Sequence, residues 1–282
     1  MLSSVEAWWA GLCAQPFDGA QGDTPRSSLG KYKIFVSLPL SMDTYLTPHR
    51  QSILNDGFVI VDAIYSSAEV EAILAIIEAV DPSNPAFRKT EDLFAIRQFL
   101  KEVPRAVPLI FNSNLKTLIN NLFGDRYFAV KSIYFDKPEL SNWFVAWHQD
   151  LTIVVDQKRD IPGYGPWTVK HNQFGVQPPL EILQDNFTIR IHLDDAGADN
   201  GALKIVSGSH LKAVYRPETI DWQVETETLC PVAAGGVMIM RPLLLHASNR
   251  TTNNQKRRVV HIEFSRAVLP EGIDWAEKMD IV

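Results

Sequence analysis

The second half of the chain consists of short segments rich in β-branched and aromatic residues, and this pattern restricts the folds that the chain can adopt. Turn residues bound these segments, and most of them have no helical pattern between them. They are Tyr127–Asp136, Asn186–Leu193, Ala202–Val206, Gly236–Met240 and Arg257–Phe264. Short strands without intervening helices favour a sandwich or barrel over a parallel α/β sheet. The sequence therefore predicts a mostly β core, either a barrel or a jelly roll.

Helical patterns dominate the part of the chain before residue 126. Apolar residues recur at helical spacing behind capping or turn residues, which predicts helices at Ala68–Ile77, Glu91–Val103 and Asn114–Phe123. The chain has no internal repeat and no clear linker. We therefore expect a single domain over residues 1–282, with a helical part at about 1–125 packed outside a β core at about 126–282.

The charge and hydropathy of the chain bear on its partners and its location. The formal net charge of -6 argues against a nucleic-acid or anionic-membrane surface, because such surfaces need a local excess of Lys and Arg. No stretch approaches the roughly 20 apolar residues that span a bilayer. The first residues carry no Lys or Arg before their apolar stretch, which is a poor secretory signal. We expect a cytoplasmic protein that acts on a small molecule.

A possible metal site lies in the sequence Trp147-His148-Gln149-Asp150. On a strand, residues two apart point to the same face, so His148 and Asp150 could hold one metal ion together. A third ligand must come from another strand, and His246 is the candidate. Two imidazoles and one carboxylate on one face of an octahedron leave three open positions, which suits Fe(II) with a chelating cosubstrate and oxygen.

Other pairs in the chain have the same spacing. His192-Leu193-Asp194 is a second His-x-Asp pair, and His261-Ile262-Glu263 is a His-x-Glu pair. Spacing alone does not choose among these sets. A chance match is common for so short a motif, and the choice needs structural context.

A possible cosubstrate anchor helps this choice. If 2-oxoglutarate chelates the metal through its keto acid, its distal carboxylate needs a cation, and the guanidinium fork of Arg fits it best. Arg257 lies eleven residues after His246 and opens the last long strand. A turn between them would bring Arg257 back beside His246. Arg258 would take this role if the phase of the strand shifted by one residue.

The same motifs identify a family resemblance over about half of the chain, from Lys131 to Phe264. The matching residues are Trp147–Asp150, Leu193–Asp195, Asp199–Leu203, Ser207–His210, His246–Ser248 and Arg257. In this combination the chain resembles the phytanoyl-CoA dioxygenase family of Fe(II)- and 2-oxoglutarate-dependent oxygenases. The resemblance implies a cupin-like double-stranded β-helix with helices outside it.

The resemblance also implies roles for single residues. It favours His148, Asp150 and His246 as the metal ligands, and it implies that Ser248 and Arg257 hold the distal carboxylate of 2-oxoglutarate. Ile133 and Arg190 match positions that line the cosubstrate pocket in other members. Arg190 departs from the family, which often has Trp there, and Ser207 replaces the usual Pro of a turn. The retained carboxylate of Asp150 argues against halogenation, because related halogenases have a small residue in its place.

Further pocket candidates come from strand alternation and from one long segment. Arg190 and His192 share one face of their strand, so His192 could contact substrate, unless this face is a polar stripe in solvent. Lys131 shares a face with Ile133 and is a weaker candidate for the cosubstrate pocket. Residues 156–179 lack a clear pattern, and Tyr164 and Trp167 within them could form a substrate lid or simply pack in a loop.

The preferred functional hypothesis is a hydroxylase that uses Fe(II), 2-oxoglutarate and molecular oxygen on a small or medium-sized organic substrate, with release of succinate and carbon dioxide. An alternative is a non-redox cupin-type metalloenzyme, an isomerase or hydrolase with Zn or Mn, which needs the same ligands but not Arg257. A third possibility is a binding module with a decayed site. The intact ligand set and Arg257 argue against this last possibility.

Overall fold

The computed structural model describes residues 42–81, 87–89, 94–139, 143–170 and 173–281. Its largest element is an eight-stranded antiparallel sheet in the order β1-β12-β9-β14-β4-β3-β2, with β15 also paired to β4. We call this the major sheet. Its strands are β1 (Phe58–Val61), β2 (Phe87–Lys89), β3 (Phe94–Arg97), β4 (Phe128–Lys137), β9 (Phe187–His192), β12 (Val237–Met240), β14 (Arg257–Ser265) and β15 (Met279–Asp280).

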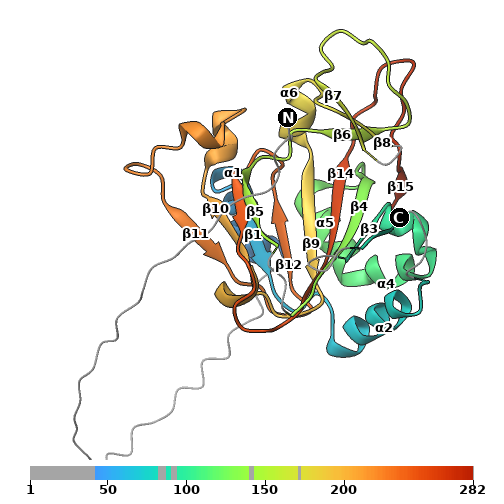
Figure 1. The fold of residues 1–282 in the computed structure, drawn as a ribbon, viewed down its shortest axis with the longest axis vertical. Helices are drawn as coiled ribbons and strands as arrows, with labels where there is room; N and C mark the ends of the chain where they lie inside the picture. Colours follow the sequence, from blue (N-terminus) through green and yellow to red (C-terminus); the bar gives the residue numbers. More distant parts are fainter. Residues whose placement is uncertain (1–41, 82–86, 90–93, 140–142, 171–172, 282) are drawn as a thin grey trace, which may run out of the picture.

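A second, four-stranded antiparallel sheet lies beside the major sheet, as Figure 1 shows. We call it the minor sheet. Its order is β11-β10-β13-β5, with β5 (Val145–His148), β10 (Leu203–Val206), β11 (Glu227–Cys230) and β13 (His246–Ser248). Leu203 and Ile205 of β10 pack with Met238 and Met240 of β12 in one buried cluster. The two sheets therefore face each other, and this apolar cluster fills one half of the space between them.

Three short strands form a separate sheet near one end of the molecule (Figure 1). They are β6 (Ile153–Val155), β7 (Trp167–Lys170) and β8 (Gln173–Val176), in the order β6-β8-β7. A hydrophobic cluster lies beneath them, which we call the end cluster, with Val130, Ile153, Val176, Leu243 and Trp275 among its buried members. Part of the long segment 156–179, for which the sequence predicted a loop, thus forms the paired strands β7 and β8, which pack on this cluster.

Helices α2 (Ser67–Glu78), α3 (Phe99–Glu102), α4 (Val107–Ile110) and α5 (Ser113–Phe123) cover the outer face of the major sheet (Figure 1), and α1 (Met42–Asn55) adds Leu46 and Ile53 to the same core. Helix α6 (Leu180–Asp185) instead packs in the end cluster through Leu183. Short 3-10 turns lie at Pro104–Ala106, Ala198–Asn200, Ser209–Lys212 and Pro217–Thr219. Ser66 and Glu69 form a capping box that starts α2. Ile73 of α2 and Leu115 of α5 are fully buried in the same core as Ile189, Ile262 and Phe264 of the sheet.

The predictions at Ala68–Ile77 and Asn114–Phe123 are confirmed by α2 and α5. The helix predicted at Glu91–Val103 is wrong where the structure describes it, because Phe94–Arg97 is strand β3 and only Phe99–Glu102 is helical. Ala95 and Arg97 pair with Phe135 and Ile133 of β4, so the main-chain hydrogen bonds of a neighbouring strand override the helical pattern. Residues 91–93 lie outside the described residues.

Two further expectations concern the chain as a whole. Within the described ranges, no helix has both the length and the apolar character needed to cross a bilayer. The single domain over residues 1–282 and the cytoplasmic location stay predictions.

Candidate iron centre

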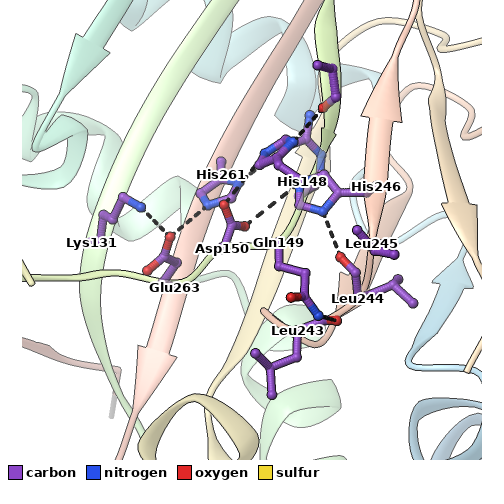
Figure 2. A network of polar contacts seen from close by, with 12 residues as sticks. Lys131, His148, Gln149, Asp150, Leu243, Leu244, Leu245, His246, His261 and Glu263 are labelled. Atoms are coloured by element: carbon purple, nitrogen blue, oxygen red, sulfur yellow. Dashed lines mark hydrogen bonds and ion pairs between the residues drawn. The ribbon is translucent and has the colours of Figure 1, made fainter. Parts of the chain in front are cut away.

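His148, Asp150 and His246 meet between the two sheets, where β5 and β13 lie side by side. His148 is the last residue of β5 and pairs with His246, the first residue of β13. Asp150 follows just after the end of β5 rather than within it. Its Oδ1 lies 3.9 Å from Nε2 of His148, and its Oδ2 lies 3.9 Å from Nε2 of His246. All three donor atoms lie within 4.8 Å of one another, so they converge on one point (Figure 2).

Both imidazole rings have the tautomer that a metal ligand needs. Nδ1 of His148 lies 2.7 Å from the carbonyl oxygen of Ala146, and Nδ1 of His246 lies 2.9 Å from that of Leu244. A carbonyl oxygen only accepts hydrogen bonds, so each Nδ1 carries the proton. The Nε2 lone pairs are therefore free and point toward Asp150. A hydrogen bond of this kind from the far ring nitrogen is the usual support of a metal-bound histidine.

Gln149 holds the turn that carries the first two ligands. Its Nε2 donates to the carbonyl oxygens of Leu243 and Ala213 at 2.6 Å and 2.8 Å, and its Oε1 accepts from the backbone N–H of Tyr215 at 2.8 Å. The N–H of Asp150 donates to the carbonyl oxygen of Pro242 at 2.8 Å. These bonds tie the turn to the segment just before His246, which explains why the sequence needs an amide between the two ligands.

The protonation states at this point suit a divalent cation. Burial lowers the pKa of His246 to about 3, so its imidazole is neutral. Burial raises the pKa of Asp150, but His246, His148 and Lys131 outweigh it and hold that pKa below the usual range of a carboxyl group. The carboxylate is therefore ionised, and its buried Oδ2 has no hydrogen-bond partner among the described residues. An ionised, unpartnered oxygen beside two free imidazole nitrogens fits Fe(II).

Three buried histidines predict an acid-sensitive fold. Burial lowers the pKa of His246 to about 3, that of His192 well below its ordinary value, and that of His261 in the same direction. In the unfolded chain each has a pKa of about 6.5. Below that pH these histidines bind protons in the unfolded state but not in the folded state. The free energy of unfolding of the metal-free protein therefore falls toward pH 3, by up to about 1.4 kcal/mol per pH unit for each histidine.

Urea unfolding of the metal-free protein between pH 7.5 and pH 5 measures this slope. The His192→Asn variant is the matched comparison, because it removes one of the three buried imidazoles and no metal ligand. We expect a shallower decline of the free energy of unfolding in this variant. An unfolding free energy that stays constant from pH 7.5 to pH 5 would contradict the prediction.

Arg257 and Ser248 offer polar atoms for an anion in the same space. Both side chains are buried, and Nε and Nη1 of Arg257 and Oγ of Ser248 have no hydrogen-bond partner among the described residues. Burial, with a smaller effect of Arg190, lowers the pKa of Arg257 to about 9, which leaves the guanidinium charged at neutral pH. A buried cation without a counter-ion is costly unless a ligand supplies the anion.

Arg258 is fully engaged on the outer side of the same strand. Its Nη2 bonds Oδ1 of Asp194 at 2.8 Å, its Nε bonds Oδ2 of Asp194 at 2.9 Å, and its Nη1 bonds Glu78 at 3.2 Å. Asp194, the carboxylate of the second His-x-Asp pair, is therefore occupied by this bidentate pair. The geometry favours Arg257 over Arg258 as an anion binder.

The third pair, His261 and Glu263, lies next to Asp150. Both residues belong to β14 and lie four and six residues after Arg257, on the same inner face of the strand. Asp150, His261 and Glu263 have donor atoms within 4.8 Å of one another. Nε2 of His261 lies 3.3 Å from Oε1 of Glu263, and Lys131 donates to the same oxygen at 2.5 Å (Figure 2). From the sequence, His261 and Glu263 were visible only as a spaced pair and were not placed beside Asp150. Their even spacing from Arg257 was the signal that they share its face.

The other predicted pocket residues divide into two groups. Ile133 and Arg190 pair with His261 from either side, and His192 pairs with Val259, so these three lie on the inner face of the major sheet. Both ring nitrogens of His192 are buried and unpartnered within the described structure. Tyr164 and Trp167 instead pack against the end cluster. Their role as a substrate lid stays a prediction.

A double-stranded β-helix that brings two imidazoles and a carboxylate to one point between its sheets defines the class of non-haem iron oxygenases. The family model described as phytanoyl-CoA dioxygenase matches residues 53–259. The chain belongs to the phytanoyl-CoA dioxygenase family, whose members depend on Fe(II) and 2-oxoglutarate. A comparison with curated proteins finds no match.

Solved structures agree with this assignment at the level of the fold. EctD from S. alaskensis, solved with 2-oxoglutarate and 5-hydroxyectoine, has a TM-score of 0.60 at 17% identity over 78% of this chain and 75% of its own. The carbocyclase SnoK from nogalamycin biosynthesis has a TM-score of 0.59 at 18% identity, over 78% of this chain and 83% of its own. HygX from Streptomyces hygroscopicus, solved with nickel and 2-oxoglutarate, has a TM-score of 0.56 at 15% identity, over 80% of this chain and 89% of its own. The predicted double-stranded β-helix with outer helices is thereby confirmed.

Proposed function

We propose that this protein is a 2-oxoglutarate-dependent hydroxylase that oxidises a C–H bond of a small organic substrate, with formation of succinate and carbon dioxide. The observation that carries the proposal is the buried Arg257, whose Nε and Nη1 have no partner on the described residues. Arg257 lies near enough to Arg190 for their charges to interact, and the charge of Arg190 in turn acts on the ligand candidate His246. A cavity with a metal site and an unpaired guanidinium fits a ligand that chelates metal at one end and carries a carboxylate at the other.

Each residue has a distinct task in this proposal. His148, Asp150 and His246 would hold Fe(II) on one face, and Arg257 with Ser248 would bind the distal carboxylate of 2-oxoglutarate. When bound, the iron with its cosubstrate and oxygen supplies an oxidant strong enough for an unactivated C–H bond. Ile133 would line the pocket as an apolar surface. Lys131 forms an ion pair with Glu263 and so balances the negative charge of this carboxylate next to Asp150.

Hydroxylation fits the cavity wall better than epimerisation does. An epimerase must return a hydrogen atom to the substrate from the opposite side, and thiols and phenols are the usual donors. The described inner-face residues of β4, β9 and β14 include neither a cysteine nor a tyrosine. Tyr134 of β4 is buried in the core under the helices. A hydroxylase needs no such donor, because transfer of an oxygen atom to the substrate completes the reaction.

The polarity of the inner face favours a small polar substrate. The structures of HygX with hygromycin B and of EctD with 5-hydroxyectoine contain polar small molecules. The inner face here is likewise polar, with Arg190, His192, His261 and Glu263 buried on it. A non-redox isomerase or hydrolase would need the same metal ligands but would have no use for an unpaired Arg257.

Anaerobic titration of the Fe(II)-loaded protein with 2-oxoglutarate tests the cosubstrate. We expect a single site, and the same titration with Zn(II)-loaded protein separates this function from the non-redox alternative. A metabolite screen for substrate-stimulated succinate formation under labelled oxygen gas then tests the reaction. We expect one labelled atom in succinate and one in the product; a labelled succinate with an unlabelled, isomeric product would contradict hydroxylation.

A further inference from the structure

Arg190 is a second buried guanidinium on the inner face of the major sheet, and it forms no ion pair with a described residue, although the charge of Asp150 acts on it. Its only hydrogen bond to a described residue joins Nη1 to Nδ1 of His261 at 3.2 Å, and its buried Nε has no partner. None of the ion pairs between described residues includes Arg190 or Arg257. Arg190 is 7% exposed, so bulk water compensates little of its charge.

A series of hydrogen bonds through His261, Glu263 and Lys131 fixes the orientation of the Arg190 side chain. A guanidinium only donates hydrogen bonds, so Nδ1 of His261 must be the acceptor and its Nε2 must carry the proton, which then points to Oε1 of Glu263 at 3.3 Å. Lys131 binds the same carboxylate. Because Nη1 of Arg190 is engaged on this side, the edge formed by Nε and Nη2 faces away from His261. That edge has the geometry of a fork for two oxygens.

The charges of the loaded site leave a cation uncompensated. Lys131 and Glu263 cancel in their ion pair, and His261 is neutral because its Nδ1 accepts from Arg190 and so carries no proton. Asp150 and the two carboxylates of 2-oxoglutarate bring three negative charges. Arg190, Arg257 and Fe(II) bring four positive charges, since burial lowers the pKa of Arg190 only to about 10. One positive charge remains, and a buried uncompensated charge favours the binding of a further anionic ligand.

We propose that the substrate carries an oxyanion, a carboxylate or a phosphate-like group, that binds the Nε edge of Arg190. This inference rests on the proposed function and names the substrate class for it. An apolar cluster lies next to His261: Phe135 lies edge-on to the His261 ring and stacks with Trp143, beside Ile133 and Ala95. The rest of the substrate would lie against this apolar cluster. Arg190 is then a residue that selects the substrate, and His261, Glu263 and Lys131 position it.

Calorimetric titration of the Fe(II)-loaded protein, saturated with 2-oxoglutarate and kept without oxygen, tests the proposal. The probes are 3-phenylpropionate, its neutral amide, and benzylphosphonate, which distinguish carboxylate from phosphate-like ligands. We expect at least one anionic probe to bind at least about tenfold more tightly than the amide, as one charge-assisted hydrogen-bonded pair predicts. Arg190→Gln should abolish this difference, and Arg190→Lys, which keeps the charge without the fork, should retain part of it.

Two control variants make the outcomes distinct. Arg105→Gln removes an exposed arginine far from the inner face and should leave probe binding unchanged. Arg257→Gln should weaken 2-oxoglutarate, whereas Arg190→Gln should change the affinity for 2-oxoglutarate by less than about threefold. If Arg190→Gln weakens 2-oxoglutarate as strongly as Arg257→Gln does, Arg190 binds cosubstrate and the inference is overturned while the proposed function stands. Anionic probes that bind no better than the amide overturn it too. Failure of the wild-type protein to bind 2-oxoglutarate contradicts the proposed function itself.

Discussion

Replacing His246 by alanine is expected to remove Fe(II) binding and with it all 2-oxoglutarate turnover. The ring is one of three donors that converge within 4.8 Å, and its tautomer is fixed by the carbonyl of Leu244. Losing even a supporting hydrogen bond of a metal ligand typically costs 10–100-fold in affinity, so loss of the ligand should cost more than about a hundredfold. Metal content after anaerobic loading and a competition titration with a coloured chelator measure the effect.

A second histidine in the same cavity provides the control for this experiment. His192→Asn changes a buried imidazole on the inner face that belongs to neither group of converging donors, so Fe(II) binding should be retained. His261→Ala tests the rival set of Asp150, His261 and Glu263. Loss of metal in His261→Ala with full binding in His246→Ala would place the ion in the rival set, and the assignment of the three ligands would be wrong.

Arg257→Met is expected to weaken 2-oxoglutarate binding and to stabilise the ligand-free protein at the same time. Truncating one partner of a buried charged pair costs about 2–5 kcal/mol, which is roughly 30-fold to several thousand-fold in affinity. Without ligand, the guanidinium is a buried charge whose Nε and Nη1 have no partner on any described residue. An unbranched apolar side chain of similar length should therefore raise the free energy of unfolding by about 1–4 kcal/mol. Calorimetric 2-oxoglutarate titration and thermal unfolding measure the two effects.

Arg258→Met is the matched variant one residue along the same strand. It breaks the bidentate pair with Asp194 and the contact with Glu78, on the outer side of the sheet. The ligand-free protein should lose stability, and its affinity for 2-oxoglutarate should stay unchanged. If instead Arg258→Met weakened 2-oxoglutarate binding and Arg257→Met left it unchanged, Arg258 and not Arg257 would be the residue that binds the cosubstrate.

Local sequence signals were sufficient for elements whose stabilising contacts are local. The helix α2 begins at its own capping box, and α5 begins at Asn112, whose side chain accepts from the N–H of Leu115. The strand β3 has no such local signal. Ala95 and Ile96 are buried because β3 pairs with β4, some forty residues later in the chain, and no helical or strand periodicity within residues 94–97 reveals that partner.

The candidate site divides in the same way. His148, Asp150, His246 and Arg257 could be chosen from short motifs and one offset along the chain, because ligands that share a strand or follow a turn keep a fixed spacing. His261 and Glu263 were visible as a spaced pair but were not placed beside Asp150. The segment around Trp167 was taken for a loop, because its hairpin depends on packing against the end cluster.

The sequence by itself thus determined the family through the combination of its short motifs, and it proposed the metal-ligand candidates and a cosubstrate arginine at Arg257 or Arg258. The tertiary structure decided which of two neighbouring arginines faces the cavity, and it brought Arg190, His261, Glu263 and Lys131 into one chain beside Asp150. The physical reason is strand register. Pairing of β9, β14 and β4 sets which side chains share the inner face, and that pairing joins residues up to 132 positions apart.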